Sequence, residues 1–290
     1  MFEGSIVAIV TPFRGGKVDE EAYRELIENQ IENGTSAIVP CGTTGESATL
    51  DIREHKQVID IAIKAVNKRV PVIAGTGGNS TSEAIELTEH AKATGADATL
   101  QVTPYYNKPT QEGLYRHFSA IAEAVPLPQV LYNVPGRTSV NMLPETVARL
   151  AEIPEIVAIK EASANLVQMA EIINLAGDNI TLLSGDDNLT LPVLAIGGKG
   201  VISVIANIVP RDTAELVGAW KAGDAAKAKD LYYKLLPLCR AMFFETNPVP
   251  VKTSLALMGK IDGELRLPLA PMSSANLERL KEVLADYGLI

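Results

Sequence analysis

The stretch PQVLYNVPGRTSVNMLPETVARLAEIPEIVAIK, residues 128–160, contains two short apolar runs separated by a longer segment with helical periodicity. The runs are PQVLYN (128–133) and IVAIK (156–160), and neither alternates apolar with polar residues. Continuous apolar runs of this length are typical of parallel strands that are buried on both faces. The stretch therefore predicts a strand, a helix over 143–152 and a second strand parallel to the first.

The same strand-then-helix unit recurs along most of the chain. The predicted strands cover 5–11, 36–40, 71–75, 97–103, 128–133, 156–160, 181–184 and 200–204. The helices that follow them cover 19–33, 51–66, 80–94, 111–124, 143–152, 165–176, 188–196 and 209–220. Eight such units in succession predict an α/β fold, a closed (β/α)8 TIM barrel, with an open doubly wound sheet as the alternative.

No strand pattern appears after about Asp224. The segments 224–243, 248–259 and 273–287 have helical periodicity instead. We therefore expect residues 1–223 to form the barrel that carries the active site, and residues 224–290 to form a three-helix C-terminal appendage. The length of 290 residues suits a barrel with such an addition.

Composition and charge exclude several classes of protein. Hydrophobic residues make up 47% of the chain and charged residues 21%, which excludes a disordered protein. The net charge of −9 argues against a nucleic-acid partner. The two cysteines, Cys41 and Cys239, are far apart in no CxxC arrangement, which suits a reducing compartment. With no signal peptide pattern, and with glycines interrupting the apolar stretch 191–210, we expect a soluble cytoplasmic protein without a membrane partner.

Candidate catalytic residues follow from the predicted strands, because active sites of such barrels lie at the carboxyl ends of the strands. Lys160 ends the strand 156–160, so a barrel would direct it into an enclosed mouth. Burial disfavours the ammonium form of a lysine, and a neutral amine can form a Schiff base with a carbonyl group. Most lysines are surface charges, and an ion pair with Glu161 is the structural alternative.

Three further features surround the same predicted mouth. Tyr132 ends the neighbouring strand and could move protons while a Schiff base forms, with packing as its structural alternative. The turn Thr43-Thr44-Gly45 offers backbone N–H groups and hydroxyls to a carboxylate, although such turns also cap helices. Arg137 is suited to bidentate pairing with a substrate carboxylate, although a single loop arginine is more often a surface charge.

Other polar groups indicate local structural roles. Asp186-Asp187 is expected to cap the following helix rather than to bind a metal, and Ser80 with Glu83 has the spacing of a capping box. The three histidines lie within helical patterns and form no H-x-x-x-H pair: His55, His90 and His117. The sequence therefore predicts no metal site.

Together these residues resemble the class I aldolase family of dihydrodipicolinate synthase and N-acetylneuraminate lyase. The resemblance runs from GSIVAIVTPF (4–13) to LRLPLAP (265–271). The motifs that carry it are GTTGES (42–47), VTPYYNKPTQEGLY (102–115), LYNVPGRT (131–138), IKEAS (159–163), LSGDD (183–187), GVISV (200–204) and NPVPVK (247–252). Several long matches in the same order are far more specific than any single motif.

The resemblance implies catalytic roles for four residues. Lys160 matches the lysine that forms a Schiff base with pyruvate, and Tyr132, Thr44 and Tyr106 match a proton relay. In the family, the residue matched by Tyr106 reaches into the site of the neighbouring subunit. This implies a homo-oligomer, commonly a dimer of two tight dimers.

The resemblance also implies binding roles. Thr43 and Thr44 lie where the pyruvate carboxylate is held, and Arg137 matches the arginine that positions the carboxylate of L-aspartate 4-semialdehyde. Gly185 and Ile202 match positions whose backbone shapes the site. The implied reaction is condensation of pyruvate with L-aspartate 4-semialdehyde in the diaminopimelate route to lysine. No cofactor is implied, because the lysine is itself the electron sink.

Two alternative functions are considered. The lyase branch of the family usually has Ser-Thr in place of Thr43-Thr44 and lacks the arginine matched by Arg137, so both features favour the synthase branch. A non-catalytic sensor of keto acids would be expected to lose at least one of the catalytic residues, and all are present.

Many family members are inhibited by L-lysine at a dimer interface, and matching residues are present. They are Ser47, Ala48, His55, Asn79, Glu83 and Tyr105. At one position where lysine-sensitive relatives often have histidine, this chain has Ile52. The resemblance therefore implies that lysine is a feedback inhibitor.

Overall fold

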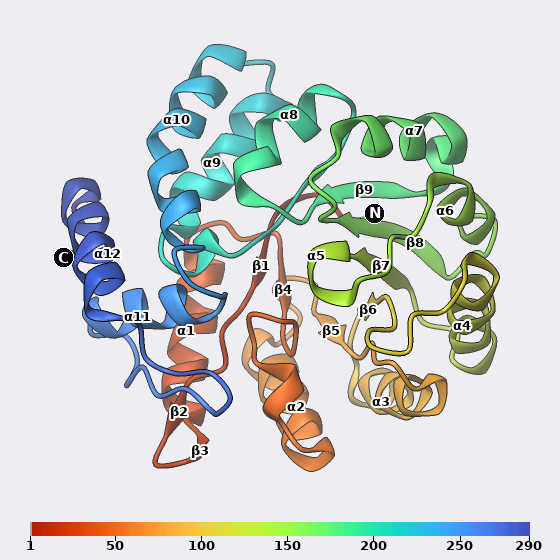
Figure 1. Ribbon diagram of the computed structural model, residues 1–290, viewed down its shortest axis with the longest axis horizontal. Coiled ribbons are helices and arrows are strands. Elements are labelled where there is room, and N and C mark those ends of the chain that lie inside the picture. Colours follow the sequence, from red (N-terminus) through yellow and green to blue (C-terminus); the bar gives the residue numbers. More distant parts are fainter. Residues whose placement is uncertain (1) are drawn as a thin grey trace.

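A barrel of eight parallel strands surrounded by helices forms the body of the protein in the computed structural model, which describes residues 2–290 (Figure 1). Around the barrel the strands are β4 (Ala37–Val39), β1 (Gly4–Ala8), β10 (Gly200–Ser203), β9 (Thr181–Ser184), β8 (Ile156–Glu161), β7 (Gln129–Asn133), β6 (Ala98–Val102) and β5 (Ile73–Gly75). A parallel bridge between Ile38 and Val72 joins β4 to β5. The backbone N–H of Gly75 also donates to Pro40 O at 2.9 Å across this seam. The predicted (β/α)8 barrel is confirmed, and the open doubly wound sheet is excluded.

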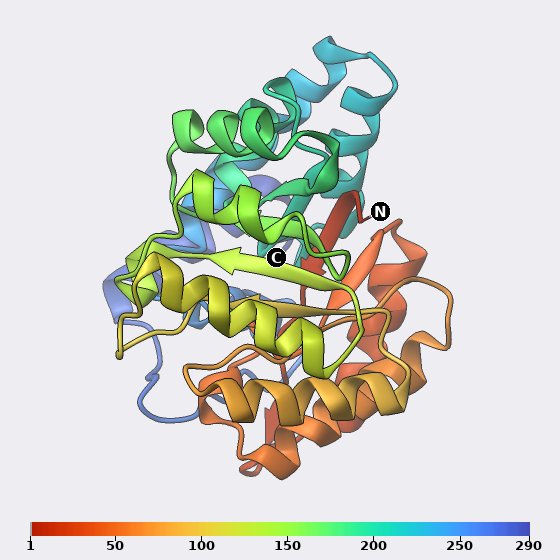
Figure 2. The same ribbon diagram turned by 90° about the vertical axis from the view of Figure 1, so that its right-hand side faces the viewer.

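Helices cover the outside of the barrel. They are α1 (Glu20–Glu32), α2 (Ile52–Val66), α3 (Thr81–Thr94), α4 (Gln111–Ala124), α6 (Pro144–Leu150), α7 (Leu166–Ala176), α8 (Thr190–Ala195) and α9 (Pro210–Lys221), with a single turn, α5 (Pro135–Thr138), before α6. Figure 2 shows α3, α4, α6 and α7 side by side on one flank. Each predicted barrel helix is present, most with ends that differ by one or two residues.

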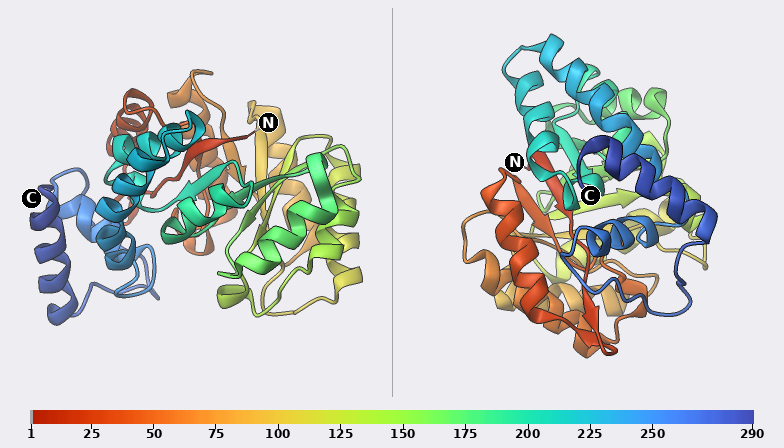
Figure 3. Two further views of the ribbon diagram at one scale, coloured as in Figure 1. Left: turned by 90° about the horizontal axis from the view of Figure 1, so that it is seen from above. Right: turned by 90° about the vertical axis from the view of Figure 1, so that its left-hand side faces the viewer.

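The last quarter of the chain is helical, as predicted. Its helices are α10 (Ala225–Ala241), α11 (Val249–Leu257) and α12 (Ser274–Tyr287). α10 packs on α9, and α12 packs on α10 and α11. In the left view of Figure 3, α12 lies at one end of the molecule, far from the flank that carries α4 and α6.

The barrel interior is filled by apolar side chains from alternate positions of the strands. Ile6, Ile73, Val130, Leu183 and Ile202 are all buried in one cluster. Their neighbours along each strand point outward to the helices, because successive side chains of a strand face opposite sides. This alternation directs a residue at a strand end either into the barrel mouth or toward the helical layer.

Three local predictions are wrong. The first strand ends at Ala8 rather than at 11, and a short antiparallel hairpin follows, β2 (Phe13–Arg14) with β3 (Lys17–Val18). Gly15 and Gly16, both at positive φ, make its turn. The predicted cap at the start of α3 also fails, since Ser80 makes no side-chain capping bond and its hydroxyl instead contacts Ser82.

The pair Asp186-Asp187 was expected to cap the next helix, and this too is wrong. Oδ2 of Asp187 accepts hydrogen bonds from the backbone N–H groups of Val204 (2.9 Å) and Ile205 (3.0 Å). These residues directly follow β10. The carboxylate therefore ties the loop after β9 to the loop after β10 instead of closing its own helix.

The apolar stretch 191–210 folds within the barrel. It contributes all of α8 except Thr190, a glycine-containing turn, the strand β10 and the first residue of α9. None of the helices within residues 2–290 combines the length and the apolar character needed to cross a membrane.

We predict that G200A destabilises the protein. A Cβ at Gly200 would lie 2.1 Å from the backbone oxygen of Gly4 on the paired strand β1, so the strands would have to separate. Overpacking of this kind costs about 1–3 kcal/mol, and more where backbone must move. Thermal unfolding would reveal a clearly lower midpoint. The control is G218A, in helix α9 with open space around the position, which should unfold at the same temperature or higher. An unchanged midpoint for G200A would contradict the strand packing described above.

Candidate active site

Lys160 and Tyr132 lie opposite each other at the carboxyl ends of β8 and β7. The register of the two strands pairs these residues, and Lys160 Nζ lies 4.3 Å from the centroid of the Tyr132 ring. Both side chains are buried, with only 5% of Lys160 exposed. A lysine amine is therefore held in a largely enclosed site against an aromatic face, beside a phenol that can exchange protons.

Glu161 does not pair with Lys160, so the structural alternative for this lysine is wrong. Its carboxylate accepts hydrogen bonds from Asn133 Nδ2, from the backbone N–H of Ser163 and from Gln168 Nε2. Burial raises the pKa of Glu161, and these hydrogen bonds oppose the rise. The carboxylate is engaged on the outer side of β8, which leaves Lys160 directed to the barrel mouth.

Two acidic groups after β9 influence the same region. Burial raises the pKa values of Asp186 and Asp187, and the positive charge of Lys160 acts in the opposite direction on both. Asp187 is almost fully buried, and its Oδ1 has no hydrogen-bond partner. The lysine thus lies within electrostatic reach of one buried carboxyl group, of Asp187, and one partly buried carboxyl group, of Asp186.

The Thr43–Glu46 turn follows β4 and is tightly built. The N–H of Gly45 donates to Gly42 O at 3.1 Å, and the N–H of Glu46 donates to Thr43 O at 3.1 Å. The hydroxyl of Thr11 donates to Gly45 O at 2.7 Å. A side chain at position 45 would press on the backbone, with a Cβ 3.1 Å from Cys41 N. This packing presents Thr43 to the cavity described below and buries Thr44.

Arg137 and Thr44 come together through Asn247, which precedes α11. Arg137 Nη2 donates to the backbone oxygen of Asn247 at 3.2 Å. The side-chain Nδ2 of Asn247 donates to Thr44 Oγ1 at 3.0 Å. Residues from two different barrel loops are thus joined by one residue of the C-terminal part of the chain.

A cavity of about 400 Å³ lies beside this part of the barrel mouth, and Lys160, Tyr132 and Thr44 lie outside its lining. Thr43, Arg137 and Asn247 line it, together with Val102 and Val134. Val134 belongs to the apolar cluster of the barrel interior that contains Tyr132, and Val102 packs against this cluster. The cavity therefore opens from the end of the barrel where β6 and β7 finish.

Gly185 and Ile202 lie at the ends of β9 and β10. The N–H of Gly185 donates to Glu161 O at 2.8 Å, and a Cβ at Gly185 would lie 2.6 Å from that of Ala162. Ile202 is fully buried in the barrel interior. Both residues pack the strand ends beside Lys160, with Gly185 allowing the close approach of the two loops.

Tyr106 is the one predicted catalytic residue that points away from the others. It is 91% exposed, and its backbone has a φ of 73°. Its loop is fastened at both sides of this residue, since Asn79 Nδ2 donates to Tyr105 O (3.2 Å) and Asn107 Nδ2 donates to Asn79 O (2.9 Å). A firmly held loop presents an aromatic side chain outward from this protomer.

The residues expected to bind lysine gather in one place. Lining the same 400 Å³ cavity are Ser47, Ala48, His55, Glu83 and Tyr105. Asn79 is joined to Tyr105 by the hydrogen bond given above, and Ile52 also lines the cavity. Burial lowers the pKa of His55, whose Nε2 donates to Gly75 O at 2.7 Å.

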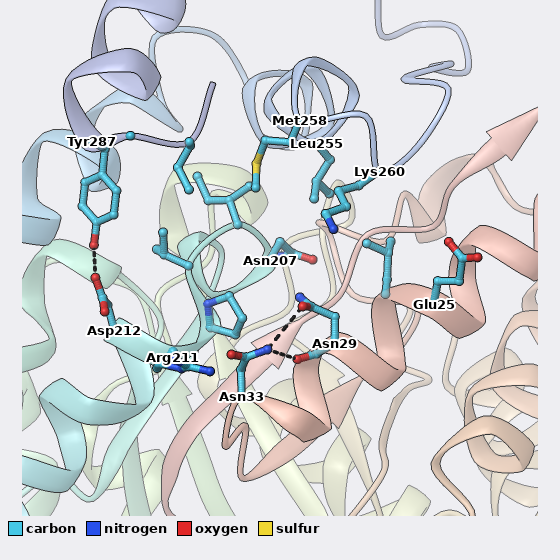
Figure 4. Close-up of a pocket in the computed structure, with 16 residues that line it drawn as sticks. Glu25, Asn29, Asn33, Asn207, Arg211, Asp212, Leu255, Met258, Lys260 and Tyr287 are labelled. Atoms are coloured by element: carbon cyan, nitrogen blue, oxygen red, sulfur yellow. Dashed lines mark hydrogen bonds between the residues drawn. The ribbon is translucent and has the colours of Figure 1, made fainter.

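A second cavity, of about 380 Å³, lies outside the barrel between α1, α9, α11 and the end of the chain (Figure 4). Arg211, Lys260 and Asn29 are at its edge, and Tyr287 is hydrogen-bonded to Asp212 there. It contains none of the predicted site residues. Within residues 2–290, no three His, Cys, Asp or Glu side chains gather as metal ligands would.

No role was predicted for Asn247, Glu46 or Lys252, although the motifs GTTGES and NPVPVK contain them. Lys252 Nζ and Glu46 Oε1 form an ion pair at 2.5 Å, and both side chains are fully buried. Their separation of about two hundred positions in the chain conceals this contact. Only the proximity of GTTGES and NPVPVK in space relates the two motifs.

The fold and the lysine at its mouth define a class: an α/β-barrel enzyme of the class I aldolase type. Within that class, the chain matches the model of the "Dihydrodipicolinate synthetase family" over residues 1–287, and it belongs to this family.

Similar proteins cover the chain from end to end. A 4-hydroxy-tetrahydrodipicolinate synthase of Geotalea uraniireducens is 64% identical over 290 residues, which is all of both chains. The chloride-inhibited dihydrodipicolinate synthase of Acinetobacter baumannii, solved with pyruvate, is 50% identical, with a TM-score of 0.98 over all of both chains. The enzyme of Cyanidioschyzon merolae, solved with lysine bound, is 43% identical, with a TM-score of 0.97 over 100% of this chain and 99% of that one.

We predict that neither cysteine reacts in the folded protein. Cys41, beside the Thr43–Glu46 turn, is buried with its thiol 3.6 Å from His55 O, and Cys239 is buried in α10. Burial raises the pKa of both thiols and so favours their protonated form. A protonated thiol does not react with alkylating reagents, whereas a thiolate does. Iodoacetamide at pH 8 should leave the native mass unchanged and add two groups after denaturation. Rapid alkylation of native Cys41 would instead indicate access from the active site.

Proposed function

We propose that the protein is a 4-hydroxy-tetrahydrodipicolinate synthase, which condenses pyruvate with L-aspartate 4-semialdehyde. The observation that carries the proposal is the buried Lys160 amine at the end of β8, 4.3 Å from the centre of the Tyr132 ring. Full-length relatives with this activity, such as the Geotalea enzyme at 64% identity, support it. A cytoplasmic location, expected from the sequence, belongs to the same proposal.

The reaction begins at Lys160. Its neutral amine attacks the pyruvate carbonyl, and the resulting carbinolamine loses water to give a protonated imine. Loss of a methyl proton converts the imine to an enamine, with the nitrogen accepting the electron pair. Tyr132 lies beside the amine and exchanges the protons of these steps. Thr43 and Thr44 hold the pyruvate carboxylate.

The enamine carbon then attacks the aldehyde of the second substrate. Arg137 lines the cavity, where its guanidinium is suited to bidentate pairing with the carboxylate of L-aspartate 4-semialdehyde. The amino group of this substrate attacks the imine carbon and displaces Lys160, which closes the ring and restores the free lysine. Gly185 and Ile202 shape the strand ends beside this chemistry.

The proton relay is proposed to be completed between subunits. Thr44 and Tyr132 come from one protomer, and the outward direction of Tyr106 supports its delivery to a neighbouring site. The active form is then a homo-oligomer, at least a dimer, with a dimer of dimers as the expected assembly.

The division into a barrel at 1–223 and an appendage at 224–290 remains a prediction.

Two alternatives are weaker. An N-acetylneuraminate lyase would not require Arg137 at the cavity, where the Asn247 backbone oxygen holds it. A keto-acid sensor would not require the hydroxyl groups of both Thr44 and Tyr132 in addition to the lysine. The product formed with each aldehyde decides between these functions.

The proposed mechanism predicts that a Schiff base can be trapped. Borohydride reduction in the presence of pyruvate should add one pyruvate-derived group to the protein, on Lys160, and K160A should gain none and lose turnover by at least about 10³-fold. Intact mass and peptide mapping measure the adduct. K199A, which changes a lysine at the amino end of β10, is the control and should behave like the native enzyme. Native enzyme that traps no pyruvate would refute the mechanism.

A further prediction concerns inhibition by L-lysine. We expect millimolar lysine to slow turnover, because the Glu83 carboxylate in the cavity attracts an ammonium group. E83Q should raise the concentration for half inhibition roughly tenfold or more, as expected for loss of a charge-assisted hydrogen bond. E86Q, on the outer side of the same helix and paired with Lys56, is the control. Full activity of the native enzyme in millimolar lysine would disprove the inhibition.

A further inference from the structure

The segment NPVPVK (247–252), at the start of α11, has no part in the mechanism above. Two of its side chains nevertheless contact the Thr43–Glu46 turn at the barrel mouth. Asn247 reaches Thr44, and Lys252 reaches Glu46. The segment belongs to the C-terminal part of the chain, and its contacts with an active-site turn indicate that it contributes to the site.

Asn247 contacts two proposed active-site residues, and only 5% of it is exposed. Its side-chain Nδ2 donates to Thr44 Oγ1 at 3.0 Å, and Thr44 is buried as well. Its backbone oxygen accepts from Arg137 Nη2 at 3.2 Å. One residue therefore holds a group proposed to move protons and a group proposed to bind the second substrate.

The hydrogen bond to Thr44 sets the direction of the hydroxyl. A threonine hydroxyl has one hydrogen and two lone pairs, whereas an amide nitrogen can only donate. With one lone pair occupied by Asn247 Nδ2, the hydrogen of Thr44 is directed away from Asn247. The opposite orientation, donation by Thr44 to an acceptor at position 247, would withdraw that hydrogen from any relay.

The contact of Lys252 with Glu46 holds the other end of the turn. The ion pair is fully buried, and Glu46 Oε2 also accepts from the backbone N–H of Arg266 at 3.3 Å. Glu46 has a φ of 55°, a left-handed conformation that is uncommon for a residue with a side chain. Lys252 Nζ further lies 4.3 Å from the centre of the Phe13 ring. The turn is thus held at Thr44 and at Glu46 by the same segment.

We propose that Asn247 is a positioning residue of the active site, which orients the Thr44 hydroxyl for proton transfer while its backbone oxygen holds Arg137. The proposal rests on the proposed function, since it assigns to Thr44 a part in the reaction. Lys252 supports this arrangement by fixing the turn on which Thr44 stands. The C-terminal helices are accordingly part of the catalytic structure of the same chain.

Two substitutions test the direction of the hydrogen bond in the full-length enzyme. N247A removes the donor, and N247D keeps the shape while replacing the donor by an acceptor that captures the Thr44 hydrogen. Both should lower kcat by roughly tenfold to a hundredfold, a part of what proton transfer by a positioned group contributes. KM for both substrates should change by less than about threefold, because ground-state binding is retained. The near-identical volume of N247D makes the test independent of how well N247A folds.

A double-mutant cycle separates positioning from a general structural role. If Asn247 acts through Thr44, N247A should lower kcat by less than about twofold once T44V has removed the hydroxyl. A role in packing alone would give the same loss in both backgrounds. T253V is the matched control, because Thr253 lies on α11, which follows Asn247 closely in the chain, is partly buried and donates only to Val249 O. It should retain kcat within about twofold.

Borohydride trapping distinguishes failure of this inference from failure of the proposed function. If the native enzyme traps no pyruvate adduct, the proposed function fails and this inference with it. If the native enzyme traps pyruvate and turns over, three results would overturn the inference alone. These are kcat of N247D within twofold of native, additive effects of N247A and T44V, and full activity of T44V.

Discussion

Closure of eight parallel strands into one barrel places the carboxyl ends of all the strands around a single mouth. The alternation of side chains along each strand then assigns every terminal residue either to that mouth or to the helical layer. On β8 this constraint separates two neighbours in the sequence. Lys160 faces the Tyr132 ring inside the mouth, while Glu161 accepts a hydrogen bond from Asn133 on the outside. A lysine can be enclosed here without an ion pair because its acidic neighbour is directed elsewhere.

Much of this arrangement could be predicted from the sequence, because its causes are local. Apolar runs without alternation predict parallel strands, and the position of Lys160 at the end of such a run predicts its direction. The strands and helices of the barrel appear where periodicity places them. The resemblance to the family adds the lysine-site residues, of which five line one cavity: Ser47, Ala48, His55, Glu83 and Tyr105.

The features that were missed depend on contacts between distant segments or on competition for a polar group. The capping-box spacing at Ser80 is correct, yet its hydroxyl contacts Ser82 instead. The carboxylate of Asp187 could cap its own helix, but the loop after β10 brings it two backbone N–H donors at Val204 and Ile205. The contact between Asn247 and Thr44 spans most of the chain, and no periodicity or spacing encodes it.

The stacking around Phe13 has a consequence for the order in which the protein assembles. Its ring lies between two cations, with Lys252 Nζ 4.3 Å and the Arg266 guanidinium carbon 4.1 Å from the ring centre. A residue near the start of the chain thus meets two residues from its C-terminal part at one aromatic side chain. Until Lys252 and Arg266 have been synthesised, Glu46 lacks its buried cation and Phe13 lacks both of its cation contacts. The mouth of the barrel consequently reaches its final form after translation has passed Arg266, however early the strands themselves have paired.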